Sequence, residues 1–149
     1  MANPVLFSNA YVAISTTTAA AYAVLSGNKG VEAPMSRAEL DNAAMGDDVE
    51  AKYPGILSVP ITLTHRQDFT TAAGGIDKTI WPLFNSRTKI RVKVRPVNSA
   101  VASSNPSYIW PGAYITGITP ITGSHGELLG NKIDIRIASG HTFTRSTTT

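Results

Sequence analysis

The chain of 149 residues contains no cysteine, which excludes disulfides, thiolate nucleophiles and cysteine-based zinc sites. Charged residues make up only 15% of it, against about 25% in typical soluble domains. No apolar run approaches the ~18 residues of a membrane helix, and the first residues lack the basic and apolar regions of a signal peptide. We therefore expect a protein that does not insert into a membrane, is kept in a cytoplasm, and gains its stability from packing and oligomerisation.

Length and charge suggest one domain with a neutral, hydroxyl-rich surface. A hydrophobic content of 42% in 149 residues is enough for one core, so we expect a single domain over residues 1–149. The net charge of +3 is too small to indicate nucleic-acid binding, and the pI near 9.3 reflects few charges rather than many basic residues. A low surface charge is typical of subunits whose surfaces are covered by neighbours, although some stable monomers share it.

Three segments in the second half of the chain alternate apolar and polar residues with the period of a β-strand. They read KIRVKVRPV, YIWPGAYITGITPIT and LLGNKIDIRIASG, and Pro- and Gly-marked loops separate them. Alternation at period two buries one face of a strand and leaves the other polar, which is typical of antiparallel sheets with one solvated face. The residues predicted to form a core between the sheets are Ile90, Val92, Val94, Ile133, Ile135 and Ile137.

A short helix and three further strands complete the predicted fold. Residues 72–84 place apolar side chains at helical spacing, although Pro82 limits the helix. Pro60 lacks an N–H and so puts its strand at an edge or marks a bulge. Together the elements predict a mainly β fold, an antiparallel β-sandwich or partly closed barrel with one short flanking α-helix and a long loop. The three strands are expected at residues 10–14, 20–25 and 55–66, and a tight turn at residues 26–30 ends the second of them.

The segment from residue 34 to residue 55 shows no clean period and is expected to be a long acidic loop. Ser36 and Glu39 have capping-box spacing, so a short helix over residues 36–44 is the alternative. Long loops inside compact domains are usually either functional or disordered. The loop holds five acids, which are Glu39, Asp41, Asp47, Asp48 and Glu50. Arms are expected at the two ends of the domain, at residues 1–9 and 138–149.

No local pattern in the sequence indicates catalysis, a metal site or a cofactor. His65, His125 and His141 lie far apart and lack the i, i+2 or i, i+4 spacing of a zinc site. The glycines and lysine of the stretch Gly126–Lys132 suggest a phosphate loop, but their spacing is wrong for one and a predicted strand rather than a helix follows. Gly130 is better explained by a bulge or tight bend, with a two-residue Gly-Asn hairpin as the alternative. We therefore expect no enzyme activity, no metal and no cofactor.

The densest basic feature is the alternation of Arg87, Lys89, Arg91, Lys93 and Arg95 along one predicted strand, of which we call the last three the basic row. In a nucleic-acid-binding domain such a row would contact phosphates, and Tyr108 and Trp110 would stack on bases. The other interpretation is a solvated strand face, or a subunit contact matched to the acidic segment. We favour it because the aromatic residues lie beside prolines and do not alternate with the basic ones. The candidate subunit interface is therefore Glu39, Asp41, Asp47, Asp48, Glu50, Arg91, Lys93 and Arg95.

The order of these elements resembles that of a known family. The phrases KYPGILSVPITLTHRQDF, LFNSRT, KIRVKVRPV, NPSYIWPGAYITGITP and GELLGNKIDIRIASG follow one another over roughly residues 53–140. In this order they resemble the tail tube (major tail) proteins of long-tailed, non-contractile bacteriophages. The resemblance lies in element order and a few short phrases, and it contains no motif as specific as a catalytic signature.

The resemblance implies a structural virion protein. Six subunits would join edge to edge so that their inner sheets close into a barrel around a lumen, the rings would stack, and genome DNA would pass through the channel into the host. The implied partners are further copies of the chain, the tape measure protein, and the tail terminator and tail tip proteins, in a virion tail assembled in the host cytoplasm. Tubes of this family are generally lined with acidic residues, whereas this chain is net basic. The alternative is a monomeric nucleic-acid- or carbohydrate-binding β domain that uses Tyr108, Trp110 and the basic strand.

Overall fold

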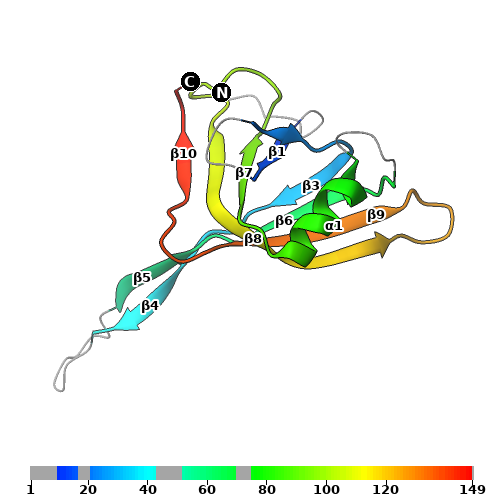
Figure 1. The fold of residues 1–149 in the computed structure, drawn as a ribbon. Helices are drawn as coiled ribbons and strands as arrows, with labels where there is room; N and C mark the ends of the chain where they lie inside the picture. The colour runs from blue at the N-terminus through cyan, green and yellow to red at the C-terminus, as the bar shows by residue number, and fades with distance from the viewer. Residues whose placement is uncertain (1–9, 17–20, 43–51, 70–74, 149) are drawn as a thin grey trace.

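The computed structural model describes residues 10–16, 21–42, 52–69 and 75–148. These residues form one eight-stranded antiparallel sheet, one helix and a separate two-stranded sheet (Figure 1). Across the large sheet the strands are β2 (Ala23–Val24), β1 (Tyr11–Ser15), β7 (Ile90–Arg95), β8 (Ser107–Thr122), β9 (Gly130–Ile137), β6 (Ile61–Arg66) and β3 (Asn28–Glu32), and β10 (Thr144–Ser146) also pairs with β8.

Strand β8 is long enough to belong to two parts of the sheet. Its residues 108–113 pair with β7, and its residues 113–122 pair with β9. Near the junction lies Gly112, whose φ of +55° is a left-handed conformation that glycine adopts without steric penalty. The sheet bends there into two halves (Figure 1). One half holds β2, β1, β7 and the start of β8, and the other, which we call the four-stranded half-sheet, holds residues 114–122 of β8 with β9, β6 and β3.

The curved sheet encloses one hydrophobic core and stays open, because β2 and β3 end it without pairing to each other. The fold is thus mainly antiparallel β, as expected, and its open curved sheet corresponds to a partly closed barrel rather than to two separate sheets. The predicted alternation is confirmed, since Ile137 is half-buried against the core and the other five predicted members are buried within it. Those five are Ile90, Val92, Val94, Ile133 and Ile135.

The helix α1 (Ile76–Ser86) confirms the predicted helix, with its bounds shifted towards the C-terminus. Ile76 and Ile80 lie one turn apart and are buried in the core, which explains the helical spacing of the apolar residues. Pro82 lies inside the helix and does not end it. The predicted first turn, residues 72–74, lies outside the described residues. The described part of the chain contains no helix that is long and apolar enough to span a membrane.

One strand prediction and one turn prediction are wrong. The predicted strand over residues 55–66 is two strands, because Pro60 has no N–H with which to continue a ladder; the first ends at Ser58 and β6 follows. Since β6 lies between β9 and β3, Pro60 marks a break between strands and not an edge or a bulge. Residues 26–30 were predicted to be a turn, but β3 begins at Asn28. Its sequence NKGVE has no alternation, and pairing with β6 stabilises it.

Residues 123–129 connect β8 to β9, and Gly130 is the first residue of β9. Gly130 begins β9 opposite Thr122, next to an irregularity in the register with β8, which agrees with a bulge or bend at this place. The alternative Gly-Asn hairpin is wrong, because the two strands are joined through residues 123–129.

Candidate assembly surfaces

Residues 36–41 and 52–58 form a projecting pair of strands, which we call the arm, where a long loop was predicted. Its strands β4 (Ser36–Asp41) and β5 (Lys52–Ser58) pair antiparallel in a sheet of their own. Figure 1 shows the arm extending away from the body of the molecule. Residues 36–41 and 52–58 are strands, so both the predicted loop and the alternative helix are wrong for them. Tyr53 and Ile56 are residue types that favour strands, and pairing between β4 and β5 overrides the local capping signal.

Large apolar side chains are exposed in and beside the arm. Ile56, the most exposed of them, shows 86% of its surface to solvent. A two-stranded hairpin alone is marginally stable in water. Clustered exposed apolar side chains indicate an interaction surface. The arm is therefore a candidate contact with another molecule. Its exposed large apolar residues are Leu40, Tyr53, Ile56 and Leu57, and Met35, also exposed, lies directly before it.

Two of the five acids predicted at an interface belong to the strands of the arm. Glu39 pairs with Lys52 across the hairpin, with its Oε2 3.2 Å from Nζ. Both side chains are largely exposed, so this ion pair contributes little to stability. Asp41 lies opposite Lys52 in the register. The other three, Asp47, Asp48 and Glu50, lie outside the described residues, and the role of all five in an interface stays a prediction.

The four-stranded half-sheet has two strand edges that lack a partner strand among the described residues. β3 pairs only with β6, and residues 114–122 of β8 pair only with β9. Unpaired edges present backbone N–H and C=O groups that favour pairing with a strand of another chain. Because the two edges lie on opposite sides of the half-sheet, one further chain can pair at each of them.

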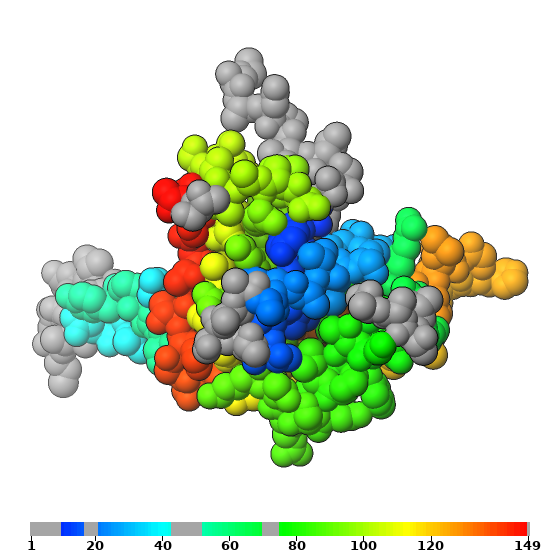
Figure 2. Space-filling model, turned by 45° about the horizontal axis from the view of Figure 1, so that its top comes forward, coloured from blue at the N-terminus to red at the C-terminus, as the bar shows by residue number. Residues whose placement is uncertain are grey.

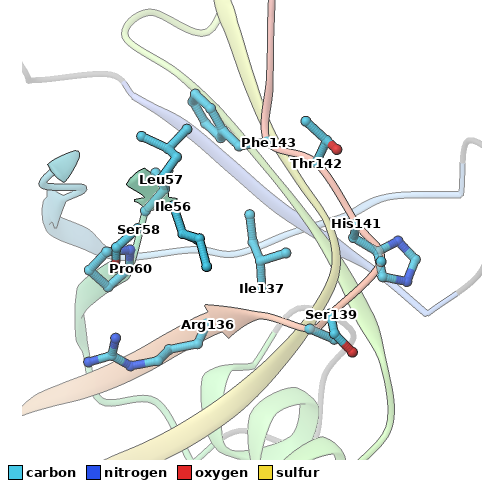
Figure 3. Close-up of a pocket in the computed structure, with 13 residues that line it drawn as sticks. Ile56, Leu57, Ser58, Pro60, Arg136, Ile137, Ser139, His141, Thr142 and Phe143 are labelled. Carbon is cyan, nitrogen blue, oxygen red and sulfur yellow. The ribbon is translucent and has the colours of Figure 1, made fainter. Parts of the chain in front are cut away.

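A cavity of about 540 Å³ lies between the base of the arm and the chain that follows β9 (Figure 3). Residues 56–60 form one wall and residues 136–143 the other. Trp110 fixes both walls. Its indole N–H donates a hydrogen bond to the carbonyl of Val59 at 3.1 Å, and its ring packs against that of Phe143 with centroids 4.9 Å apart. The cavity is therefore formed by the fold itself.

The second wall is also attached to β8 at the bend. The backbone N–H of Ala138 donates to the carbonyl of Gly112 at 3.0 Å. The ring of His141 lies against Gly112, so a side chain at position 112 would displace this exposed ring. After this wall, residues 144–146 of the predicted C-terminal arm form β10 on β8, and the predicted N-terminal arm at 1–9 lies outside the described residues.

The basic row lies on β7, and its side chains are half-buried. Lys93 Nζ lies 5.5 Å from the ring centroid of Tyr22, and Arg95 Cζ lies 4.0 Å from that of Tyr11, both within cation–π range. Burial lowers the pKa of Lys93, and the neighbouring charges of Arg95 and Arg91 lower it further. Burial raises the pKa of Tyr22, against the effect of Arg91. These cations thus make contacts within the subunit, and their place in a subunit interface stays a prediction.

The aromatic residues considered for base stacking are largely covered. Trp110 is only 2% exposed, and Tyr108 is half-buried with its ring stacked on that of Phe143 at 6.2 Å. Because stacking requires an exposed ring face, the alternative of a nucleic-acid- or carbohydrate-binding domain loses its main feature. Within the ranges that the structure describes, no three His, Asp or Glu side chains form a group that could hold a metal ion.

Sequence reasoning missed the apolar surface of the arm and the role of Trp110. For the arm a signal was present: Leu40, Tyr53 and Ile56 are large apolar residues in a segment interpreted as an acidic loop, and such residues in a loop suggest a surface that a partner covers. For Trp110 there was no signal, because nothing in the sequence links it to Val59, 51 residues earlier.

Comparison with known proteins relates the fold to tail tubes. No protein-family model and no curated protein matches the sequence. Among solved structures, the SPP1 tail tube aligns with a TM-score of 0.74 and 10% identity, over 97% of this chain and 80% of that one. The tail of an empty gene transfer agent particle, with C6 symmetry, aligns with a TM-score of 0.65 and 15% identity, over 93% of this chain and 95% of that one. The sheath/tube terminator of the extracellular contractile injection system PVC aligns with a TM-score of 0.70 and 14% identity, over 97% of this chain and 98% of that one. The chain therefore has the fold of tail tube proteins.

Proposed function

We propose that this chain is a structural subunit of a tail tube, that it assembles into stacked hexameric rings, and that it has no catalytic role. The observation that carries the proposal is the pair of unpaired edges on the four-stranded half-sheet, in a chain with the tail tube fold. A ring of six is supported by the C6 symmetry of the similar gene transfer agent tail. The scarcity of charge fits a surface that neighbouring subunits cover.

Strand directions support closure of the half-sheets into one barrel. All pairings in the half-sheet are antiparallel, so β8 and β6 run one way while β9 and β3 run the other. β3 of one copy would therefore lie antiparallel to residues 114–122 of β8 in the next copy. A contact between two different surfaces closes into a ring when the rotation between copies fits, and closure leaves no free edge.

The face of the half-sheet turned away from the core would then line the channel. It carries Thr62, Lys132, Asp134 and Arg136, at positions that alternate with buried residues. Asp134 accepts a hydrogen bond from the hydroxyl of Thr62 at 2.7 Å. This face carries two of these cations against one carboxylate, together with a hydroxyl group, so the lumen would be mixed in charge and not acidic. The basic row on β7 lies in the other half of the sheet, which would place it away from the channel.

The arm would reach a neighbouring subunit, in the next ring, where its apolar residues would be covered. By the same proposal, the other partners are the tape measure protein in the lumen, the tail terminator and tail tip proteins at the ends, and duplex DNA that passes through to the host without specific contacts. The subunit would be assembled in the host cytoplasm and would become part of the virion tail.

Negative-stain electron microscopy of the concentrated protein tests this proposal. We expect rings or tubes with a central channel, and sixfold symmetry in end-on views. Light scattering on the same sample should show growth of large particles with concentration. A protein that stays a small monomer at every concentration would overturn the proposal and favour the monomeric binding domain.

A further inference from the structure

The turn between β8 and β9 forms a second projection, which we call the tip (residues 123–129). Figure 2 shows it at the end of the molecule opposite to the arm. The turn is preformed: the N–H of Glu127 donates to the carbonyl of Ser124 at 3.0 Å, and the Glu127 carboxylate accepts from the N–H of Ser124 at 3.2 Å. Gly126 has a φ of +87°, which only glycine adopts readily.

This preformed turn holds two apolar side chains in solvent. Leu128 is 63% exposed and Leu129 is 37% exposed. Because the backbone around them is already fixed, little ordering entropy is lost when a partner covers them. The tip is therefore suited to enter an apolar cavity.

The cavity at the base of the arm has matching chemistry. Ile56 and Ile137 lie toward the space between its walls, and Arg136 lies at its edge (Figure 3). Arg136 is exposed, and its charge is opposite to that of Glu127 on the tip. Opposite charges at the rim of an apolar contact favour one docking partner and orientation over others.

We propose that the tip of one copy docks into the cavity of a second copy, with Leu128 against Ile56 and Ile137, and with Glu127 near Arg136. The inference rests on the proposed function, because it names a contact through which rings stack. It adds a second contact between rings to the one expected from the arm.

The positions of the tip and the cavity make this contact repeat along a line. The tip precedes the first residue of β9, and the cavity begins near its last residues, so the two lie at opposite ends of one strand. A pair joined in this way still has one free tip and one free cavity, and each can bind a further copy. Strands of a barrel run along its axis with a tilt, so the line of copies would run from ring to ring.

The absence of cysteine from the chain makes disulfide trapping a clean test. The double variant Leu128→Cys/Ile56→Cys is assembled, oxidised and separated on a non-reducing denaturing gel. We expect a ladder of covalent oligomers beyond the dimer. An equal mixture of the two single variants should give dimers only, and each single variant alone should give monomers. The matched control pairs Ile56→Cys with Trp81→Cys, at an exposed site on α1, and should give no ladder.

A second variant measures the contribution of the tip without cross-linking. Leu128→Ser should form rings as the parent does, but should raise the concentration needed for tubes about tenfold. Val24→Ser, at another exposed apolar site, is the matched control and should leave that concentration unchanged.

The outcomes separate this inference from the proposed function. Tubes in the microscope without a ladder from the double variant would overturn the docking and leave the tail tube proposal standing. An equal ladder from the Trp81 control, or normal tube formation by Leu128→Ser, would also overturn the docking. If the parent protein formed no ring or tube at all, both proposals would fall together.

Discussion

The indole N–H of Trp110 donates a hydrogen bond to the carbonyl of Val59, 3.1 Å away in space and 51 residues earlier in the chain. Both side chains are buried. Val59 follows the last strand of the arm, and Trp110 lies in the first part of β8. One hydrogen bond thus attaches the base of the arm to the middle of the large sheet.

We expect Trp110→Phe to lower the free energy of unfolding by about 1–3 kcal/mol, because the carbonyl of Val59 would stay buried without a donor. Urea denaturation measures this change. The matched control is Trp81→Phe, which alters an exposed ring on α1 and should change stability by less than about 0.5 kcal/mol. Equal effects in the two variants would show that the bond to Val59 contributes nothing.

Ile135→Ala should cost about 2–5 kcal/mol of stability, since the side chain is fully buried and pairs in register with Ile61 and Ile115. Ile121→Ala removes the same atoms from an exposed position on β8 and should cost less than about 0.5 kcal/mol. Urea denaturation of both variants compares them directly. A loss at Ile135 no larger than that at Ile121 would mean that the inward face of β9 is assigned wrongly.

The core could be predicted from sequence because the signal is local. Val92 and Ile135 alternate with charged neighbours, and a period of two determines which face is buried without knowledge of the partner strand. α1 was predicted for the same reason, from the spacing of Ile76 and Ile80. The identity of the partner strands is absent from such patterns.

The arm, β3 and the cavity depend on pairing between segments that lack a period of their own. Asn28 begins a strand only because β6 lies beside it, and Ser36 begins one only because β5 does. The cavity needs Val59 and Phe143 on the two sides of Trp110, which no local pattern predicts. These features therefore could not be predicted from the sequence alone.

His65 should make the protein less stable in mild acid. Its side chain is fully buried, and its Nδ1 lies 3.2 Å from the carbonyl oxygen of Ser26. Burial lowers its pKa from 6.5 to about 4, although the Ser26 carbonyl opposes the shift. Between these values the unfolded chain binds a proton that the folded chain does not. The stabilisation is therefore complete above pH 6.5 and is lost as the pH falls towards 4.

A pKa unit corresponds to about 1.4 kcal/mol, so the loss attributable to His65 can reach about 3 kcal/mol. Urea midpoints from pH 7.5 to pH 4.5 measure it. His65→Gln keeps a donor for the carbonyl of Ser26 but cannot titrate, so its stability should depend less on pH in this window. Carboxylates that titrate at low pH affect both proteins alike. Identical pH dependence in the two would rule out His65 as the cause.

Replacement of the arm, residues 36–58, by a short Gly/Ser linker should give a folded, soluble monomer that no longer forms tubes. The body should fold because the arm is a separate sheet, and a short linker suffices because Ser36 and Ser58 are paired neighbours. Light scattering gives the particle size, and electron microscopy shows whether tubes form.

Two matched variants separate the chemistry of the arm from its presence. Leu40→Ser/Tyr53→Ser removes exposed apolar surface and should weaken tube formation as the deletion does. Lys52→Gln breaks the exposed ion pair with Glu39 but keeps all five predicted interface acids, and should leave tubes intact. Normal tubes from the chain without the arm would refute the arm as a ring-to-ring contact.

The row Arg91, Lys93 and Arg95 should not hold DNA in the channel. The strand that carries it lies outside the four-stranded half-sheet, and Lys93 and Arg95 lie over tyrosine rings. A ring of phosphate contacts in the lumen would release counterions at every contact and fix the duplex in place. We therefore expect tubes to bind duplex DNA weakly at low salt, and the variant with all three residues changed to Gln to bind it equally weakly.

The matched control for the basic row changes two cations of β9 in the opposite half-sheet, Lys132→Gln/Arg136→Gln. If that face lines the channel, any residual binding of DNA should fall in this variant and not in the variant of the row. Binding is measured by co-sedimentation of duplex DNA with tubes over a range of salt concentrations, after microscopy has confirmed tubes in each preparation. Tight, salt-sensitive binding by the parent that disappears when the row is changed would contradict the assignment of the channel face. Such binding would place phosphates at β7, because each lost phosphate contact reduces the dependence of affinity on salt.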